Sequence, residues 1–415
     1  MPGPVSRRQA PRAAHRSGRV GLALAGGGFL GAAYELGVLA ALAESLEGVE
    51  LHRLDAYVGV SAGAFIAAGL ANGKTPHQMV RMFVEDEVEA LDPAAMLHPA
   101  RHLLARALRS APTAAQQVLE AGLSEGGRGV RAVLWQALER VGRMMPSGLL
   151  DAGPAERTLE RIFDEPGRTN DFRRLGTLLR IVATDIDDGR PVEFGAPGFD
   201  DVPISRAVIA SSAMPGLFPP VRIGRRYFVD GALNKTLHAS VALNEGVGLL
   251  LCVNPLVPFT APANGPPGRI AHASLPIVLS QSIRTAIRSR MTVGLEKYRI
   301  THPDARIVLF EPRSDDAGVF FTSIFTLGNR RRVCEQAYQQ TRSDLLARRE
   351  ALEPMLAPFG IRLNLKVLRD PELRLVRSAP PPRGRRVDGF EDGMLRLRHT
   401  LDDLQRSLRV SSRSD

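Results

Sequence analysis

The chain has 415 residues, of which 44% are hydrophobic and 24% are charged, and its formal net charge at pH 7 is +10. This length allows one large domain with appendages, and the composition is that of an ordinary globular protein. The positive charge suits anionic partners such as phospholipid head groups. The sequence has no zinc-finger spacing and only 5% aromatic residues, so nucleic-acid recognition is not expected.

The two ends of the chain look unlike the rest. Residues 1–18 are expected to form a disordered basic arm, because they contain arginines but no apolar run of the signal-peptide type. Residues 376–415 are expected to form a low-complexity linker and a basic tail. Cys252 and Cys334 lie far apart and form no CxxC or metal-ligand spacing, which argues against a disulfide framework. We expect a cytoplasmic protein without signal peptide or transmembrane helix, whose contact with membranes is at most peripheral.

Residues 19–256 alternate short apolar runs with helical patterns. This alternation predicts an α/β fold with a mainly parallel central sheet flanked by helices. The predicted strands are Val20–Ala25, Ala56–Val60, Leu178–Thr184, Arg226–Val229 and Gly248–Val253. The predicted helices are Gly31–Leu46, Ala62–Ala71 and Ile204–Ser211.

Between residues 84 and 164 the strand patterns vanish, and segments such as Pro99–Leu108 and Val130–Gly142 have helical periodicity. This region is predicted to be a helical insertion. Two roles stay open for it: a lid or cap that faces the substrate, or a plain helical cover packed on the sheet.

Residues 257–375 are predicted to form a helical C-terminal extension packed on the core. A loop over residues 257–268 precedes a long helix over Ile270–Tyr298, a late strand over Ala305–Glu311 and a helix from Asn329 to Leu352. The apolar residues of the long helix repeat near the helical period: Ile277, Leu279, Ile283, Ile287, Met291 and Leu295. Either the helix packs through this apolar side with its charges solvated, or its arginines touch acidic lipid. These arginines are Arg284, Arg288 and Arg290.

The first motif with chemical meaning is the glycine run Gly26–Gly31, which follows a predicted strand and opens a helix. Through Gly26, Gly28 and Gly31 it matches G-x-G-x-x-G, the dinucleotide-binding fingerprint. Glycines let backbone N–H groups approach an anion, and a helix N-terminus favours negative charge. A pyrophosphate or the oxyanion of an acyl intermediate would suit this loop, and so would a tight turn without any ligand.

The second motif is a G-x-S-x-G pentapeptide formed by Gly59, Ser61 and Gly63. It lies between a predicted strand and a predicted helix of small residues, which is the context of a nucleophile elbow. A dinucleotide-binding domain would instead carry an acidic residue at the end of its second strand. The pentapeptide therefore favours a catalytic serine over dinucleotide binding.

A catalytic serine needs a base. None of the histidines after Ser61 follows a predicted strand in a convincing position, and the best of them, His238, is more typical of a structural histidine. The third motif supplies an alternative: Asp230, Gly231 and Ala232 follow an aromatic strand. The two small residues leave room for another backbone to approach the carboxylate of Asp230.

In this order, the three motifs resemble those of the patatin-like phospholipase family, which carries a glycine-rich oxyanion loop, a G-x-S-x-G elbow and a D-G-[AG] motif. The segments Val182–Asp185 and 210–220 are similar to the family as well, and the resemblance covers about residues 18–256. It implies a three-layer α/β/α fold and a lipid acyl hydrolase of the phospholipase, lysophospholipase or esterase type. It also implies Ser61 as nucleophile, Asp230 as proton acceptor and an acyl-enzyme intermediate. The implied oxyanion hole is formed by the N–H groups of Gly26, Gly27 and Gly28.

The resemblance implies a lipid or acyl-ester substrate, transient contact with an anionic membrane surface, and no metal or organic cofactor. The sequence departs from the family at two places. Leu30 stands where many members have arginine or lysine, and Leu233–Leu237 stands where the family often has an N-x-P element. Two alternatives stay open: a non-catalytic membrane- or protein-binding module on the same scaffold, and a nucleotide-binding oxidoreductase.

Overall fold

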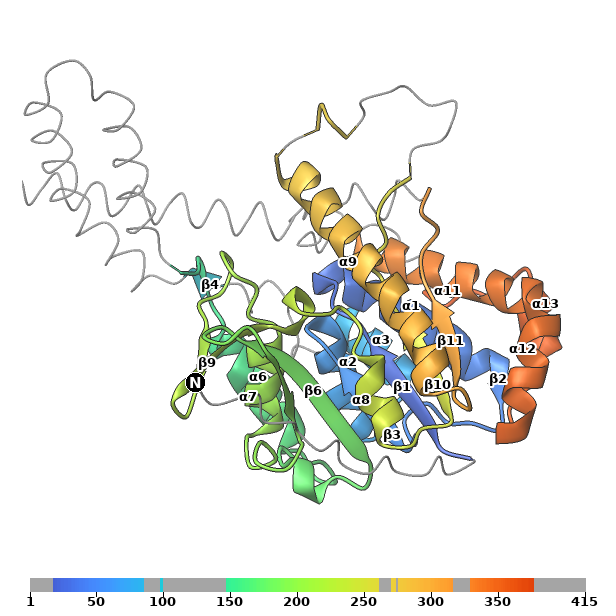
Figure 1. The fold of residues 1–415 in the computed structure, drawn as a ribbon. Coiled ribbons are helices and arrows are strands. Elements are labelled where there is room, and N and C mark those ends of the chain that lie inside the picture. The colour runs from blue at the N-terminus through green and yellow to red at the C-terminus, as the bar shows by residue number, and fades with distance from the viewer. Residues whose placement is uncertain are drawn as a thin grey trace, which may run out of the picture.

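The computed structural model describes residues 18–85, 98–99, 147–260, 270–273, 275–315 and 329–376 (Figure 1). Its centre is an eight-stranded sheet with the strand order β11-β10-β1-β3-β6-β9-β8, and β7 pairs with β6 outside this path. Within the described ranges no helix is both long enough and apolar enough to cross a membrane.

Five neighbouring strands of the sheet are parallel. They are β1 (Val20–Leu24), β3 (Ala56–Gly59), β6 (Leu178–Asp185), β10 (Leu249–Val253) and β11 (Arg306–Phe310). The remaining strands are antiparallel to a neighbour. They are β7 (Pro191–Phe194), β8 (Val221–Ile223) and β9 (Arg226–Asp230). The mainly parallel sheet is confirmed, but the run Arg226–Val229 forms an antiparallel strand, which the alternation of strands and helices did not reveal.

Helices cover both faces of the sheet. Side chains of β1 alternate between two cores, with Leu22 and Leu24 in the larger and Ala23 in the smaller. The larger core is shared with α1 (Gly28–Ser45), α2 (Ala62–Ala71), α3 (Pro76–Phe83), α6 (Gly153–Phe163), α7 (Ile204–Ser211) and α11 (Arg330–Ala347). The smaller core is closed by α8 (Ala239–Asn244) and α9 (Leu275–Thr301), which lie on the near side of the sheet in Figure 1. The fold is therefore a three-layer α/β/α sandwich.

Short elements complete the described chain. They are β2 (Leu46–Glu47) paired with β12 (Arg362–Leu363), β4 (His98–Pro99) paired with β5 (Leu150–Asp151), α12 (Arg349–Leu356) and α13 (Leu365–Arg369). The β4–β5 pair lies inside the segment 84–164, where no strand was expected. Most of that segment, including Pro99–Leu108 beyond its first residue and Val130–Gly142, lies outside the described residues.

The long helix α9 packs differently from the prediction made on its apolar repeat. Leu279 and Ile283 are 51% and 58% exposed, whereas Arg284 is only 4% exposed. The guanidinium of Arg284 points inward because it donates a hydrogen bond to the backbone oxygen of Val257, at 3.1 Å. The predicted packing face is therefore wrong for Leu279 and Ile283, and Arg284 is not available to touch lipid.

Helices α1 and α11 cross at very short distance. At Gly37 of α1, an added Cβ would lie 2.2 Å from the backbone oxygen of Cys334 on α11. Below the crossing, Glu44 of α1 accepts hydrogen bonds from Tyr338 of α11 and from His77 of α3. Helix α11, from the C-terminal extension, is thus packed directly on the first helix of the sheet domain.

Gly37→Ala should force α1 and α11 apart and lower the free energy of unfolding by about 1–3 kcal/mol, measured by urea denaturation. Gly294→Ala in α9 is the matched control, since its added Cβ would meet only the hydroxyl of Tyr298, at 3.9 Å. That control should be neutral or stabilising by up to about 1 kcal/mol, because alanine favours helix more than glycine does. Equal stability of both variants would contradict the close crossing.

Candidate active site

Ser61 stands in a sharp turn between β3 and α2. Its backbone has φ 54° and ψ −121°, and no other non-glycine residue of the described chain has a positive φ. The neighbouring strand approaches so closely that a Cβ on Gly63 would lie 2.6 Å from the backbone oxygen of Leu24. A strained backbone of this kind costs about 1–3 kcal/mol and persists only where its surroundings enforce it. This turn is the elbow expected from the G-x-S-x-G spacing.

A buried serine on another element holds the elbow in place. The backbone N–H of Ser61 donates to Ser211 Oγ at 2.8 Å, and Ser211 Oγ donates to the backbone oxygen of Val182 at 2.6 Å. Ser211 is the last residue of α7 and is fully buried. From sequence, Ser211 is predicted only as the end of the helix Ile204–Ser211 and as part of the family-like segment 210–220, without a role of its own. The only local signal for a role is a hydroxyl that ends an otherwise apolar helix face.

Asp230 is brought to Ser61 by the register of the sheet. Gly59 on β3 pairs with Ile181 on β6, and Ala183, two residues further along β6, pairs with Asp230 on β9. Ser61 is likewise two residues beyond Gly59, so the serine and the aspartate reach the same level on either side of β6. Ser61 Oγ donates a hydrogen bond to Asp230 Oδ2 at 2.7 Å.

The carboxyl of Asp230 is 1% exposed. Burial raises its pKa to about 6, while hydrogen bonds from Ser61 and from the backbone N–H of Ala232 act in the opposite direction. The Ala232 N–H donates to Oδ1 at 2.8 Å, so both carboxylate oxygens have a partner. At pH 7 the group is therefore mostly ionised and able to accept a proton, and its pKa lies near the pH, which is the range that suits proton transfer.

The glycine loop lies next to the serine. A Cβ on Gly26 would lie 3.2 Å from the Cβ of Ser61. Helix α1 begins at Gly28 with Gly27 as its N-cap, and no side chain caps it. In its first turn, the Gly31 N–H donates a hydrogen bond to the backbone oxygen of Gly27. The first N–H groups of a helix have no intrahelical acceptor, so they are available to an anion beside Ser61.

The departure at Leu30 has a structural explanation. Leu30 is 4% exposed and packs in the larger core, so its side chain does not line the cavity that opens beside Ser61. The preceding residue, Phe29, lines that space instead. The surroundings of the glycine loop on this helix are therefore apolar.

His238 does not take part in the Ser61–Asp230 hydrogen bond. It is 3% exposed and stands at the N-cap of α8. Burial and the nearby Lys235 lower its pKa to about 4, so it is uncharged at pH 7. Of the other histidines considered, His77 pairs with Glu44 and His302 bonds Asn244, which are structural contacts. In the described part of the chain no cluster of three or more His, Cys, Asp or Glu side chains is placed to hold a metal ion.

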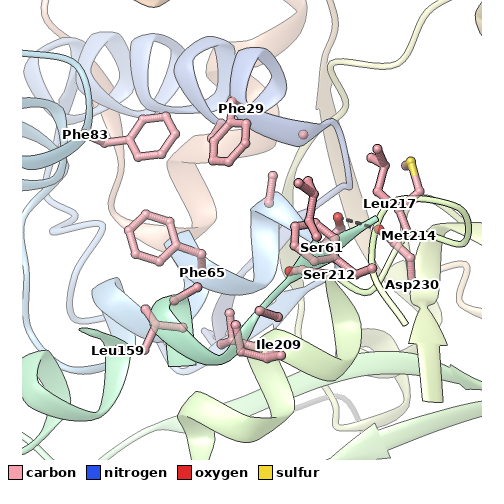
Figure 2. Close-up of a pocket in the computed structure, with 18 residues that line it drawn as sticks. Phe29, Ser61, Phe65, Phe83, Leu159, Ile209, Ser212, Met214, Leu217 and Asp230 are labelled. Carbon is pink, nitrogen blue, oxygen red and sulfur yellow. Dashed lines mark hydrogen bonds between the residues drawn. The ribbon is translucent and has the colours of Figure 1, made fainter. Parts of the chain in front are cut away.

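A cavity of about 140 Å³ opens beside Ser61 and Asp230. Figure 2 shows Ser61 and Asp230 at one end of it and the rings of Phe29, Phe65 and Phe83 at the other. Those rings pack on one another with centroids 5.9 and 6.3 Å apart. Phe83 immediately precedes the 84–164 insertion, and Leu159 of α6 lies near the end of that insertion. The lining of the cavity is mostly apolar, which suits a hydrocarbon chain.

A model of the family described as patatin-like phospholipase matches residues 22–243, which is more than half of the 415 residues. The chain belongs to the patatin-like phospholipase family. This membership supports a lipid hydrolase activity. The segment matched includes the glycine loop, the elbow and the D-G-A motif of the patatin-like chain.

Solved structures similar to the patatin-like chain include VipD from Legionella pneumophila, with 16% identity and a TM-score of 0.37. Another is the type III effector protein ExoU, with 18% identity and a TM-score of 0.34. A third is human GIVD cytosolic phospholipase A2 in complex with methyl gamma-linolenyl fluorophosphonate, with 14% identity and a TM-score of 0.35. The similarity covers 80%, 85% and 83% of the patatin-like chain and 67%, 55% and 60% of those chains, respectively. The chain thus spans less than two thirds of the last two. A search of curated proteins finds no match.

Ser211→Ala in this patatin-like protein should leave the Ser61 N–H buried without an acceptor. We expect a loss of about 1–3 kcal/mol in the free energy of unfolding and a lower kcat with little change in KM, because the elbow is no longer fixed. Ser212→Ala, at the next position, is the control and should unfold like the parent. A Ser211→Ala enzyme with unchanged kcat would rule out this positioning role.

Asp230→Asn should make the protein more stable at pH 8. Burial raises the pKa of Asp230 to about 6, above its value in the unfolded chain, so the ionised carboxylate opposes folding as pH rises through this range. A shift of two units corresponds to about 3 kcal/mol, which is the largest gain expected. The gain should shrink as the pH falls from 6 toward 4, because Asp230 becomes protonated in the folded state, and it should vanish below the pKa of the unfolded chain, about 4.

Asp171→Asn is the control of opposite sign. Arg173 lowers the pKa of Asp171 to about 2, so its carboxylate favours folding at neutral pH, and its loss should not stabilise the protein. Thermal unfolding at pH 4 and pH 8 measures both variants. An Asp230→Asn variant no more stable than the parent at pH 8 would show that the buried carboxylate is not a burden on the fold.

Proposed function

We propose that this protein is a lipid acyl hydrolase that uses Ser61 as nucleophile and Asp230 as proton acceptor. The observation that carries the proposal is the 2.7 Å hydrogen bond between Ser61 Oγ and Asp230 Oδ2 at the end of an apolar cavity. The strained elbow supports it, since such strain is found where function requires it.

In the first half of the reaction, Ser61 Oγ attacks the carbonyl carbon of the ester, and its proton passes to Asp230 Oδ2. The negative charge that forms on the carbonyl oxygen is stabilised by backbone N–H groups of Gly26, Gly27 and Gly28 at the start of α1. When the tetrahedral species collapses, the ester C–O bond breaks and Asp230 returns the proton to the leaving alcohol. The acyl group remains on Ser61.

In the second half, a water molecule attacks the acyl-enzyme and gives its proton to Asp230. The bond to Ser61 Oγ then breaks, the fatty acid leaves, and the proton returns from Asp230 to the serine. The two oxygens of Asp230 have different roles: Oδ1 accepts the hydrogen bond from the Ala232 N–H, and Oδ2 accepts and returns the proton. No step requires a metal ion or an organic cofactor.

The cavity suggests which acyl groups fit best. Its volume of about 140 Å³ is close to that of an apolar cavity that accepts a benzene molecule, so it holds a short hydrocarbon segment. We expect short acyl esters to be hydrolysed readily by the protein in this conformation.

The purified chain should hydrolyse p-nitrophenyl butyrate, and a fluorophosphonate probe should label Ser61 as found by peptide mapping. Ser61→Ala should abolish both without unfolding the protein. Because burial raises the pKa of Asp230 to about 6, kcat/KM should fall about tenfold per pH unit below pH 6 and reach a plateau above it.

His238→Asn is the matched control for the choice of base. It should keep most of the activity and the same pH profile, since its pKa of about 4 and its position separate it from Ser61. Loss of activity in this variant, with the fold intact, would favour a histidine-containing triad instead. A protein that binds lipid vesicles but never reacts with the probe would favour the non-catalytic module, and stabilisation by NAD(P) or FAD would favour the oxidoreductase.

A further inference from the structure

The outward face of α9 carries an exposed apolar stripe. Four of the seven large hydrophobic side chains that are exposed in the described residues lie on this helix: Leu279 at 51%, Ile283 at 58%, Val293 at 68% and Ile300 at 82%. Helical spacing puts them on one side together with one alanine and two cations. We call this face the outer stripe; it consists of Leu279, Ile283, Ala286, Arg290, Val293, Lys297 and Ile300.

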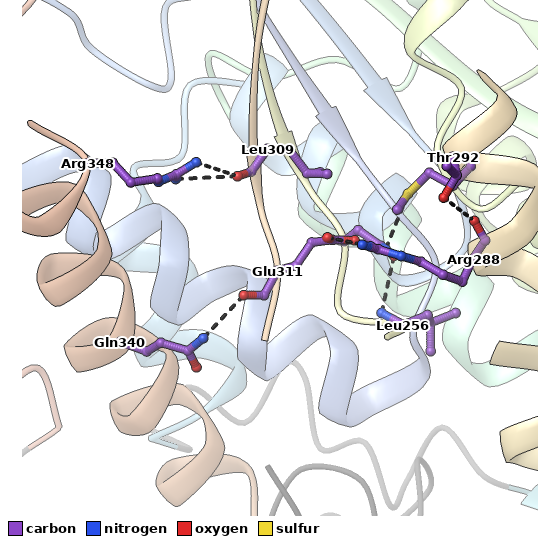
Figure 3. A network of polar contacts seen from close by, with 9 residues as sticks. Leu256, Arg288, Thr292, Leu309, Glu311, Gln340 and Arg348 are labelled. Atoms are coloured by element: carbon purple, nitrogen blue, oxygen red, sulfur yellow. Dashed lines mark hydrogen bonds and ion pairs between the residues drawn. The ribbon is translucent and has the colours of Figure 1, made fainter. Parts of the chain in front are cut away.

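The opposite face of α9 is fixed to the protein. Arg288 forms an ion pair with Glu311, with 2.6 Å between Nη1 and Oε2, and Glu311 also accepts from Asn254 at 2.8 Å (Figure 3). Arg284 is buried and bonds the backbone oxygen of Val257. Two of the three arginines once considered for lipid contact therefore hold the helix in place. Their contacts keep the outer stripe turned toward solvent.

The outer stripe continues onto the loop that carries the proposed base. Arg290 Nη1 donates to the backbone oxygen of Leu233 at 3.0 Å, and Leu233, three residues after Asp230, is itself 50% exposed. Lys235, two residues further, is exposed and lines a small cavity together with Arg290. Apolar and basic side chains thus form one surface from α9 to the Asp230 loop.

The charges on the outer stripe itself, Arg290 and Lys297, are positive. Glu296 is the only acidic residue of α9, it lies beside the stripe, and it forms an ion pair with Arg299. Arg290, Lys297 and Lys235 alternate with the leucine, isoleucine and valine side chains. Isolated exposed apolar residues are common on proteins, but a row of them interleaved with cations is typical of a helix that lies in an anionic lipid interface.

We propose that the outer stripe, extended by Leu233 and Lys235, is the surface through which this protein docks on an anionic lipid surface. The inference rests on the proposed function, since a lipid acyl hydrolase meets its substrate at an interface. Docking inserts the leucine, isoleucine and valine side chains between acyl chains and places the cations at the head groups. It brings the Asp230 loop, which touches α9 through Arg290, to the same interface.

The test measures sedimentation of the full chain with vesicles, in the Ser61→Ala background so that the lipid is not consumed. The vesicles contain phosphatidylcholine with phosphatidylglycerol, or phosphatidylcholine alone. Ile283→Asp/Val293→Asp changes the outer stripe and should weaken binding to the anionic vesicles at least about tenfold, because two apolar side chains no longer enter the bilayer. The matched control is Thr285→Asp/Thr292→Asp, which adds the same charge to exposed positions of α9 away from the stripe. It should bind nearly as well as the parent.

Three outcomes would overturn the proposal. The first is that the stripe variant binds like the parent. The second is that both double variants lose binding equally. The third is that the parent binds zwitterionic and anionic vesicles alike. A parent that is dimeric in sedimentation equilibrium and becomes monomeric only in the stripe variant would assign the surface to a second copy instead.

A second measurement separates this proposal from the proposed function. With Ser61 restored, the stripe variant should hydrolyse the soluble ester p-nitrophenyl butyrate at the parent rate but act more slowly on vesicle lipid. Loss of vesicle activity alone supports the docking surface. A parent that hydrolyses no ester would refute the proposed function, while the vesicle-binding comparison would still decide whether the outer stripe docks on lipid.

Discussion

The backbone of Ser61 adopts a conformation that a serine avoids, and much of the sheet domain is arranged to enforce it. With φ at 54°, the residue would relax in an unconstrained turn. It is prevented from doing so by Ser211 from α7, which accepts its N–H, and by β1, which passes close to Gly63. Gly63, in the first turn of the helix behind the elbow, has to be small for the same reason, because an added Cβ would lie 2.6 Å from the backbone oxygen of Leu24.

Burial of Asp230 joins the proposed chemistry to the stability of the fold. The carboxylate has its two hydrogen bonds but little contact with water, and its pKa is raised to about 6. The same environment that makes it a better base makes it an unfavourable residue for folding above that pH. Rigid packing around it, with β6 on one side and the elbow on the other, holds the charge beside the serine.

A feature of the fold or the site could be predicted from the sequence when neighbouring residues determine it, and could not when contacts between residues far apart in the chain determine it. The glycine loop and the Ser61 elbow are recognisable from sequence, because a strand, a turn and a helix follow within a dozen residues. The meeting of Ser61 and Asp230 was suggested by a family resemblance, but its geometry depends on the register of β9, an antiparallel strand that the pattern of strands and helices did not reveal. Ser211 and the orientation of α9 were missed because hydrogen bonds to distant backbone atoms decide them, and hydrophobic periodicity does not report such bonds.

The strand order has a consequence for where this domain can be cut. The segment that matches the family ends at residue 243, yet β10 (Leu249–Val253) pairs along the whole length of β1 and lies between β1 and β11. A fragment that stopped at residue 243 would expose the hydrogen-bonding edge of β1, which is buried on both faces and almost entirely apolar. An uncovered edge of that kind recruits other strands and leads to aggregation. The segment that matches the family is therefore shorter than the segment needed to complete the sheet.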